Sequence, residues 1–434
     1  SMLFDLLYWN FGFLRVGTGG LTAQAFGKQD WKECARILTR ALGISLGIAI
    51  CLILIQWIFV KAAFLVVDCT PEVRELASRY FFIRIWAAPA TLSLMALKGW
   101  FIGMQDSVSA MITDFVVNGM NVLMSIVLAL GITVPSAGVL INGMGFSGIA
   151  AGTVAAQYSG LIVALLLIAV KYRSKVFEAF SSADLKGVFK GSETRRFFVM
   201  NADLFVRSLC FIAIYIGFTV ISARYGDILL AVSSIMMKIL MIFSYFTDGF
   251  AYAGEAMTGR YIGARDLPNL RTTVKWTFVW SMGLAVAFVG IYHFGGVLLL
   301  KMMTSDVAVV EASRDYLPWL VLMPVVGCAA FTWDGIFIGA TGSKDMRNSM
   351  LWSVVAFAGV WIAGVVVLNC FHPLSSGIPF ASPDLSTVPS DAMPAPTPYG
   401  IAAMHILMGA YFAHLIARTV YLTVKSPRIF RFSD

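Results

Sequence analysis

Charged side chains interrupt several long apolar stretches of this 434-residue sequence. Asp203 and Arg207 are spaced i, i+4, and Asp248 and Glu255 are spaced i, i+7, so on a helix each pair shares one face. A buried acid can exchange a proton, and an incoming cation favours its ionised form, so proton and cation can compete for one carboxyl group. This pattern makes Asp248 and Glu255 candidates for titration, with a structural pairing as the alternative, and it favours a local structural ion pair between Asp203 and Arg207.

Asp334 and Lys98 are a further pair of candidates, because each precedes a similar run, Gly335-Ile-Phe-Ile-Gly339 or Gly99-Trp-Phe-Ile-Gly103. We expect each charge to anchor its own helix, with the alternative that the two meet across a pseudo-symmetry axis. Arg15 and Arg84, which also lie inside apolar runs, could pair locally or extend to the membrane surface, and Arg418 lies close enough to an interface to extend to it.

Signals for an enzyme or a bound cofactor are weak. The run Phe26-Gly27-Lys28 is followed by Gln29 instead of Ser or Thr, so it does not match a phosphate-binding loop. His405 and His414 are nine positions apart, on opposite sides of a helix, and the six cysteines have no metal-ligand spacing. We therefore expect no catalytic residue, no metal and no cofactor.

The composition indicates the elements that must position these charges. Hydrophobic residues make up 59% of the chain and charged residues 13%, and the mean hydropathy is +0.81, which together indicate a polytopic membrane protein. This composition excludes a soluble enzyme, a DNA-binding domain and a disordered linker. Eleven spans are predicted, near residues 2–25, 37–67, 78–103, 108–134, 143–170, 197–223, 228–259, 274–300, 315–340, 349–371 and 400–424.

The distribution of Lys and Arg predicts the orientation. Cations cluster in the loops around residues 28–40, 171–196, 260–275 and 425–431, which marks these loops as cytoplasmic. The Pro-rich stretch 372–399 has no Lys or Arg and is predicted to be an external loop. Much of the net charge of +8 is thus explained by topology, and it does not indicate a nucleic-acid partner.

The sequence repeats itself at an offset near 236. Residues 12–30 match 249–266, and residues 78–103 match 313–339. The predicted organisation is an N-terminal lobe at 1–172, a cytoplasmic linker at 173–196 and a C-terminal lobe at 197–434. The repeat partner of span 197–223 would precede Ser1, so we expect six spans in each half of the intact protein and the first of them missing from this chain.

The motifs together resemble the multidrug and toxic compound extrusion (MATE) family, in its DinF-like branch. The resemblance covers nearly the whole chain and rests on six segments: Phe11 to Ala25, Lys98 to Gly103, Asn118 to Asn121, Asn201 to Arg207, Asp248 to Glu255, and Asp334 to Ala340.

The resemblance implies an all-α membrane protein with two six-helix lobes around a central cavity. It implies an antiporter in the bacterial cytoplasmic membrane, a monomer that exports amphipathic, often cationic compounds in exchange for protons or sodium. The first helix of the family usually carries the coupling aspartate, and many members have a second one where this chain has Ser125, four residues after Asn121. The alternative is a lipid-linked precursor flippase of related architecture, for which Arg15, Arg84, Lys98 and Lys238 would bind a phosphate head group.

Overall fold

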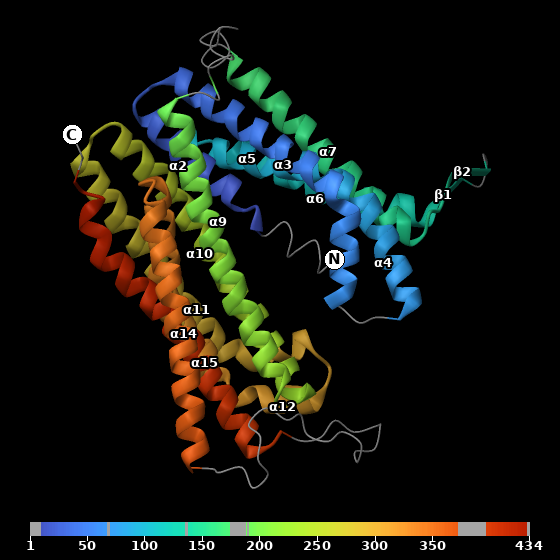
Figure 1. Cartoon of the computed structure of the whole chain (residues 1–434), viewed down its shortest axis with the longest axis vertical. Helices are drawn as coiled ribbons and strands as arrows, with labels where there is room; N and C mark the ends of the chain where they lie inside the picture. Colours follow the sequence, from blue (N-terminus) through green and yellow to red (C-terminus); the bar gives the residue numbers. More distant parts are fainter. Residues whose placement is uncertain are drawn as a thin grey trace. The chain divides into compact units, whose positions relative to one another are not determined.

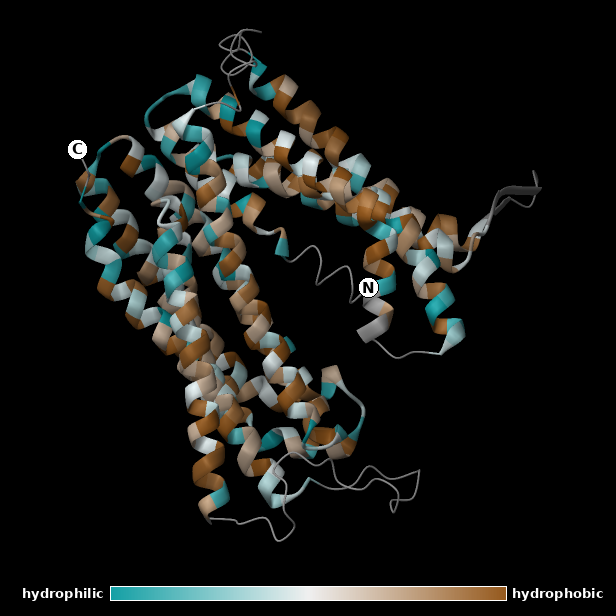
Figure 2. Ribbon diagram, in the orientation of Figure 1, coloured by the Kyte–Doolittle hydropathy of each residue, from teal (hydrophilic) through white to brown (hydrophobic). Residues whose placement is uncertain are grey.

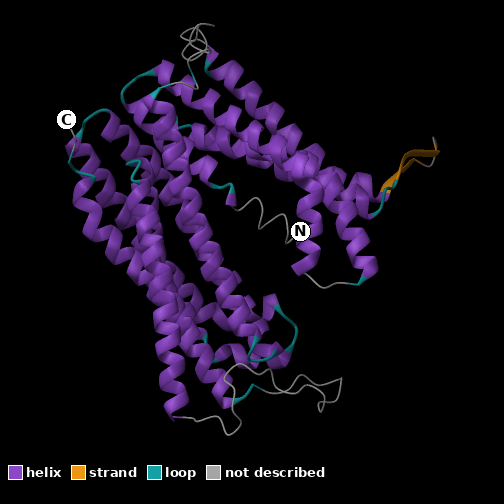
Figure 3. Ribbon diagram, viewed as in Figure 1, coloured by secondary structure: helices purple, strands orange, loops and turns teal. Residues whose placement is uncertain are grey.

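The computed structural model describes residues 10–66, 70–134, 138–173, 188, 191–371 and 396–431. Within these ranges, ten helices are long and apolar enough to cross a membrane (Figure 3). Hydrophobic residues follow most of the length of the helices, and hydrophilic residues gather toward their ends (Figure 2). The predicted α-helical membrane fold is therefore confirmed, with one short β-hairpin added to it.

The chain divides into two compact units. Unit 1 comprises Ser1–Ala202 and Gly259–Arg265, and unit 2 comprises Asp203–Thr258 and Asp266–Asp434. The division falls inside two long helices, α9 (Ser192–Ala223) and α10 (Asp227–Gly263), whereas the boundary predicted from the sequence is the linker at 173–196. That linker (173–196), the Pro-rich loop (372–399) and the start of the first span lie largely outside the described residues.

Unit 1 is a bundle in which α5 packs against α2, α3 and α7, and α6 packs along α7 (Figure 1). Its elements are α2 (Phe13–Gly27), α3 (Trp31–Val66), α4 (Pro71–Arg84), the 3-10 helix η1 (Ile85–Ala87), α5 (Ala88–Gly103), α6 (Ser107–Leu130), β1 (Gly131–Val134), β2 (Gly138–Asn142) and α7 (Phe146–Lys171).

Unit 2 is built around α13, which packs against α11, α14 and α15. The elements from α9 to the last described turn are α9 (Ser192–Ala223), α10 (Asp227–Gly263), α11 (Leu267–Met303), α12 (Val307–Arg314), α13 (Leu317–Gly339), α14 (Ser343–Phe371), α15 (Pro398–Lys425) and the 3-10 helix η4 (Ser426–Arg428).

Two predicted spans differ from the structure in ways that local chemistry explains. The predicted span 108–134 ends early, because α6 stops at Gly131, whose φ of 80° leaves the helical region, and residues 131–134 form β1 of an antiparallel hairpin. The predicted span 78–103 is interrupted at η1, immediately before Pro89 in the first turn of α5. A helix tolerates a proline only in its first turn, because the missing N–H has no hydrogen-bond partner there. The helix is therefore interrupted just before Pro89, and a new helix begins at Ala88.

The internal repeat is present in the backbone. Four described non-glycine residues have positive φ, Gln29 at 58°, Gln105 at 60°, Arg265 at 55° and Thr341 at 54°. They form two pairs at the predicted offset, since 265 − 29 and 341 − 105 both equal 236. Left-handed backbone is costly for such residues, so its recurrence at both positions identifies the same inter-helix turns in both halves.

Close helix contacts repeat at the same offset. A Cβ atom at Gly99 would collide with the carbonyl oxygen of Arg15, and one at Gly335 would collide with that of Ala251. These contacts join α2 to α5 in unit 1 and the equivalent α10 to α13 in unit 2. Small residues allow such backbone approach in membranes, where van der Waals packing largely drives helix association.

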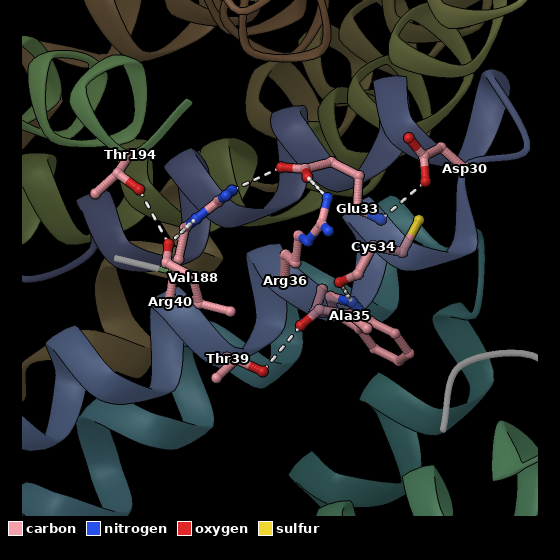
Figure 4. A network of polar contacts seen from close by, with 10 residues as sticks. Asp30, Glu33, Cys34, Ala35, Arg36, Thr39, Arg40, Val188 and Thr194 are labelled. Carbon is pink, nitrogen blue, oxygen red and sulfur yellow. Dashed lines mark hydrogen bonds and ion pairs between the residues drawn. The ribbon is translucent and has the colours of Figure 1, made fainter. Parts of the chain in front are cut away.

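One of the cations predicted to lie in a cytoplasmic loop, Arg40, is buried in unit 1 and joins two segments of the chain. The Arg40 side chain is 6% exposed, donates to the carbonyl oxygen of Val188 at 2.8 Å and pairs with Glu33 at 2.6 Å (Figure 4). Thr194 donates to the same carbonyl oxygen at 3.0 Å. Val188 is thereby fixed to α3 and to the start of α9.

Candidate functional site

A buried ion network in unit 2 gathers charges from three helices. Asp334 on α13 is ion-paired with Arg207 on α9 and with Arg418 on α15. The Nε atom of Arg418 donates to Oδ1 of Asp334 at 3.1 Å, and the Arg418 side chain is only 2% exposed. One carboxylate thus pairs with two guanidinium groups and ties α9 and α15 to α13.

Asp203, on α9 with Arg207, adds an ion pair to α14. Its carboxylate pairs with Arg347 at 2.6 Å and accepts a hydrogen bond from the Ser343 hydroxyl at 2.9 Å. The local Asp203–Arg207 pair favoured from the sequence is therefore replaced by two ion pairs to other helices. We refer to Asp203, Arg207, Asp334, Arg347 and Arg418 together as the arginine–aspartate network.

The two acids of α10 differ in how deeply they are buried. Asp248 is half-buried and interacts electrostatically with Arg418, which connects it to the arginine–aspartate network. Glu255 is fully buried, two turns further along the same helix. Next to Glu255, Gly254 faces Thr277 on α11 and Ile336 on α13, so this part of α10 packs into the interior of unit 2.

The candidates of unit 1 have separate partners. Lys98 on α5 pairs with Asp114 on α6, so Lys98 and Asp334 each anchor helices within their own unit, as favoured from the sequence. The Asn121 side chain accepts hydrogen bonds from Ser125 at 3.3 Å and from Thr153 on α7 at 3.1 Å. Asn121 and Ser125 thus form part of the α6–α7 contact.

Each of the other candidate cations has its own surroundings within the unit to which it belongs. Arg15 is half-buried on α2, where its backbone faces Gly99. Arg84 donates to the Tyr80 hydroxyl at 3.1 Å, a local contact that agrees with the expectation. Lys238 is exposed on α10. The expectation that Arg418 extends to the membrane surface is wrong, because its side chain is buried and ion-paired with Asp334.

A second charged cluster lies in unit 1 at the turn between α5 and α6. Asp106 accepts hydrogen bonds from Ser109 Oγ at 2.6 Å and Tyr172 Oη at 2.8 Å, and pairs with Lys171 at 2.7 Å. Burial alone would raise the pKa of Asp106, but these hydrogen bonds outweigh burial and hold the pKa below its usual value. Burial and the neighbouring carboxylate raise the pKa of Tyr172. The cluster caps α6 and fastens it to the end of α7.

Sequence reasoning assigned no functional role to Arg347 and Arg418. Arg347 is 144 positions from its partner Asp203, and no local pattern links them. Arg418 had a usable signal, because it follows the buried residues Tyr411 and His414 at helical spacing on α15. A cation on the buried face of a helix requires an acid on a neighbouring helix.

The chain is similar to known transporters over most of its length. The family model MatE matches residues 1–127 and 204–367. DNA damage-inducible protein F of Escherichia coli (strain K12) is 34% identical over 358 residues, which are 82% of this chain and 74% of that protein. The probable multidrug resistance protein NorM of Photorhabdus laumondii is 24% identical over 330 residues, 75% of this chain and 67% of that protein.

Solved structures share the fold. An outward-facing multidrug resistance MATE family transporter of the MOP superfamily matches with a TM-score of 0.79 and 16% identity, over 100% of this chain and 88% of that one. A MATE structure in complex with MaL6 matches with a TM-score of 0.75 and 16% identity, over 98% of this chain and 87% of that one.

Proposed function

Because the chain belongs to the MatE family of multi-pass membrane transporters, which are not enzymes, we propose that it exports amphipathic, often cationic small molecules in exchange for protons or sodium. We further propose that it works as a monomer in the lipid bilayer and that acids of unit 2 couple export to the cation gradient.

The fully buried carboxyl group of Glu255 on α10 carries the coupling proposal. An acid inside a membrane-spanning helix is costly, about 2.5–3.5 kcal/mol for Asp at the centre of an inserted helix, so it is a functional candidate by default. Asp248 lies two turns away on the same helix and interacts with Arg418. Exchange requires that a proton or sodium ion and the exported cation compete for such a carboxyl group.

Asp334 has a different part in this proposal. Removing one partner from a buried ion pair leaves an uncompensated charge. Asp334, which has two arginine partners, is therefore assigned to holding α9, α13 and α15 together, and Asp248 and Glu255 to coupling.

The flippase alternative has less support. It needs cations that are open to a phosphate head group, but Lys98 is ion-paired with Asp114 and Arg84 donates to Tyr80. In unit 2, Arg418 and Arg207, with side chains 2% and 20% exposed, are both ion-paired with Asp334.

The test uses the purified protein in liposomes with tetraphenylphosphonium as a lipophilic cation probe. We expect probe uptake when the lumen is acidic or rich in sodium, and collapse of uptake when a protonophore or a sodium ionophore dissipates that gradient. A parallel set of liposomes carries a fluorescent lipid-linked phosphate, whose transfer between leaflets is followed by an impermeant quencher. Absence of gradient-driven probe uptake, or lipid transfer without probe uptake, would overturn the proposal.

A further inference from the structure

Two cavities of unit 2 have one lining residue in common, an arginine. A groove of about 710 Å³ lies between α11 and the start of α13, and a smaller cavity of about 360 Å³ lies beside α12. Arg314, the last residue of α12, lines both. Neither cavity includes any residue of the arginine–aspartate network.

The larger groove is suited to a hydrocarbon chain. Apart from Arg314 and His293, it is lined by Val289, Tyr292, Leu317, Pro318, Val321, Leu322 and Val325. Leu322 and Val325 are 47% and 44% exposed on a helix that is long and apolar enough to cross a membrane, so the groove is open along the surface of this helix. From Leu317 to Val325 the groove follows α13 for about 12 Å. This length is most of one leaflet, whose hydrocarbon part is about 15 Å thick.

The smaller cavity adds acids beside the same arginine. Glu311 and Asp315 line it together with Arg314. The Nε atom of Arg314 lies 3.8 Å from Glu311, with both side chains largely exposed, so this pair is weak. A guanidinium group carries five N–H donors, and such a long contact leaves several of them for an anionic oxygen.

The order of these groups complements a zwitterionic lipid. We propose that unit 2 binds phosphatidylethanolamine, with an acyl chain in the α11–α13 groove, the phosphate on Arg314 and the ammonium group between Glu311 and Asp315. The carboxylates accept hydrogen bonds from a primary ammonium, which a quaternary choline cannot donate, and they repel a purely anionic head group. Arg314 at the polar end of the groove disfavours a cationic compound in the same place.

Native mass spectrometry of the delipidated protein tests the proposal, with equal amounts of dioleoyl phosphatidylethanolamine, phosphatidylglycerol and phosphatidylcholine. We expect phosphatidylethanolamine to bind about two- to fivefold more tightly than either of the others, the effect of one or two partly exposed charge contacts. Arg314→Gln removes the contact to the phosphate that all three lipids share, so it should lower the binding of all three. Glu311→Gln combined with Asp315→Asn should make phosphatidylethanolamine and phosphatidylcholine equal.

Two further variants separate lipid binding from general damage. Val325→Trp fills the exposed groove and should lower the binding of all three lipids, whereas Lys301→Gln removes an exposed cation that lines neither cavity and should change nothing. A preference for phosphatidylglycerol, equal binding by the Arg314→Gln and Lys301→Gln variants, or displacement of the lipid by tetraphenylphosphonium would overturn the proposal.

Discussion

The two units share their backbone contacts and differ in their buried charges. The glycine-mediated contacts at Gly99 and Gly335 are repeat equivalents, but the residues just before them are Lys98 in unit 1 and Asp334 in unit 2. The Lys98–Asp114 pair is 30% and 48% exposed, whereas Asp334 and Arg418 are 11% and 2% exposed. The helix packing at this position thus recurs in both copies, while the ion pair beside it is buried in unit 2 and partly exposed in unit 1.

Neutralising the central acid of unit 2 should have the largest effect on stability. Asp334→Asn leaves Arg207 and Arg418 without their shared carboxylate, and we expect it to lower the free energy of unfolding by about 3–5 kcal/mol. The equivalent change in unit 1, Lys98→Gln, breaks a partly exposed pair and should cost less than about 1 kcal/mol. Unfolding by SDS in mixed micelles measures both, and equal losses would mean that the two units do not differ as described.

Adding a methyl group at the repeated glycines should destabilise both units alike. Gly99→Ala and Gly335→Ala each place a Cβ against a backbone carbonyl oxygen, and we expect each to cost about 1–3 kcal/mol. Gly119→Ala and Gly359→Ala are matched controls, because no atom lies within 4 Å of a Cβ at either position. They should be neutral or stabilising by up to about 1 kcal/mol. A loss at only one repeated glycine would contradict a shared packing role.

The Asp106 cluster should make the stability of unit 1 depend on pH in the acid range. The pKa of Asp106 is lowered in the folded protein, so its contribution is complete above the unfolded pKa of about 3.9 and is lost as the pH falls through the folded value. The wild-type melting temperature should therefore fall below about pH 4 more steeply than that of Asp106→Asn. Melting followed by tryptophan fluorescence tests this, and parallel curves would exclude the cluster as the cause.

The sequence predicted the features that recur along the chain. Apolar length located the long helices, and the offset of 236 anticipated the repeated turns at Gln29 and Arg265. The hairpin of β1 and β2 was missed because the apolar residues of β1 were interpreted as a continuation of the preceding helix. The short helix α12 was missed because, at eight residues, it is too short for a search based on apolar spans.

The ionic partners could not be predicted to the same extent. Asp203 and Arg207 have ideal spacing for a local pair, but each meets an opposite charge more than 120 positions away, Arg347 and Asp334 respectively. Local spacing supplies only candidates, whereas the choice among them depends on which helix faces are buried together. Lys98 was assigned correctly as an anchor, but its partner Asp114 was not identified.

The central claim, that buried acids of unit 2 couple transport to the cation gradient, is tested most directly in liposomes that carry single variants. Tetraphenylphosphonium uptake is measured over a range of lumen pH for wild type, Glu255→Gln, Asp248→Asn and Asp227→Asn. The last is a control, because Asp227 is exposed in the first turn of the same helix. The account predicts that Glu255→Gln or Asp248→Asn loses the pH dependence of uptake, while Asp227→Asn retains it. Wild-type pH dependence in all three variants would contradict the account.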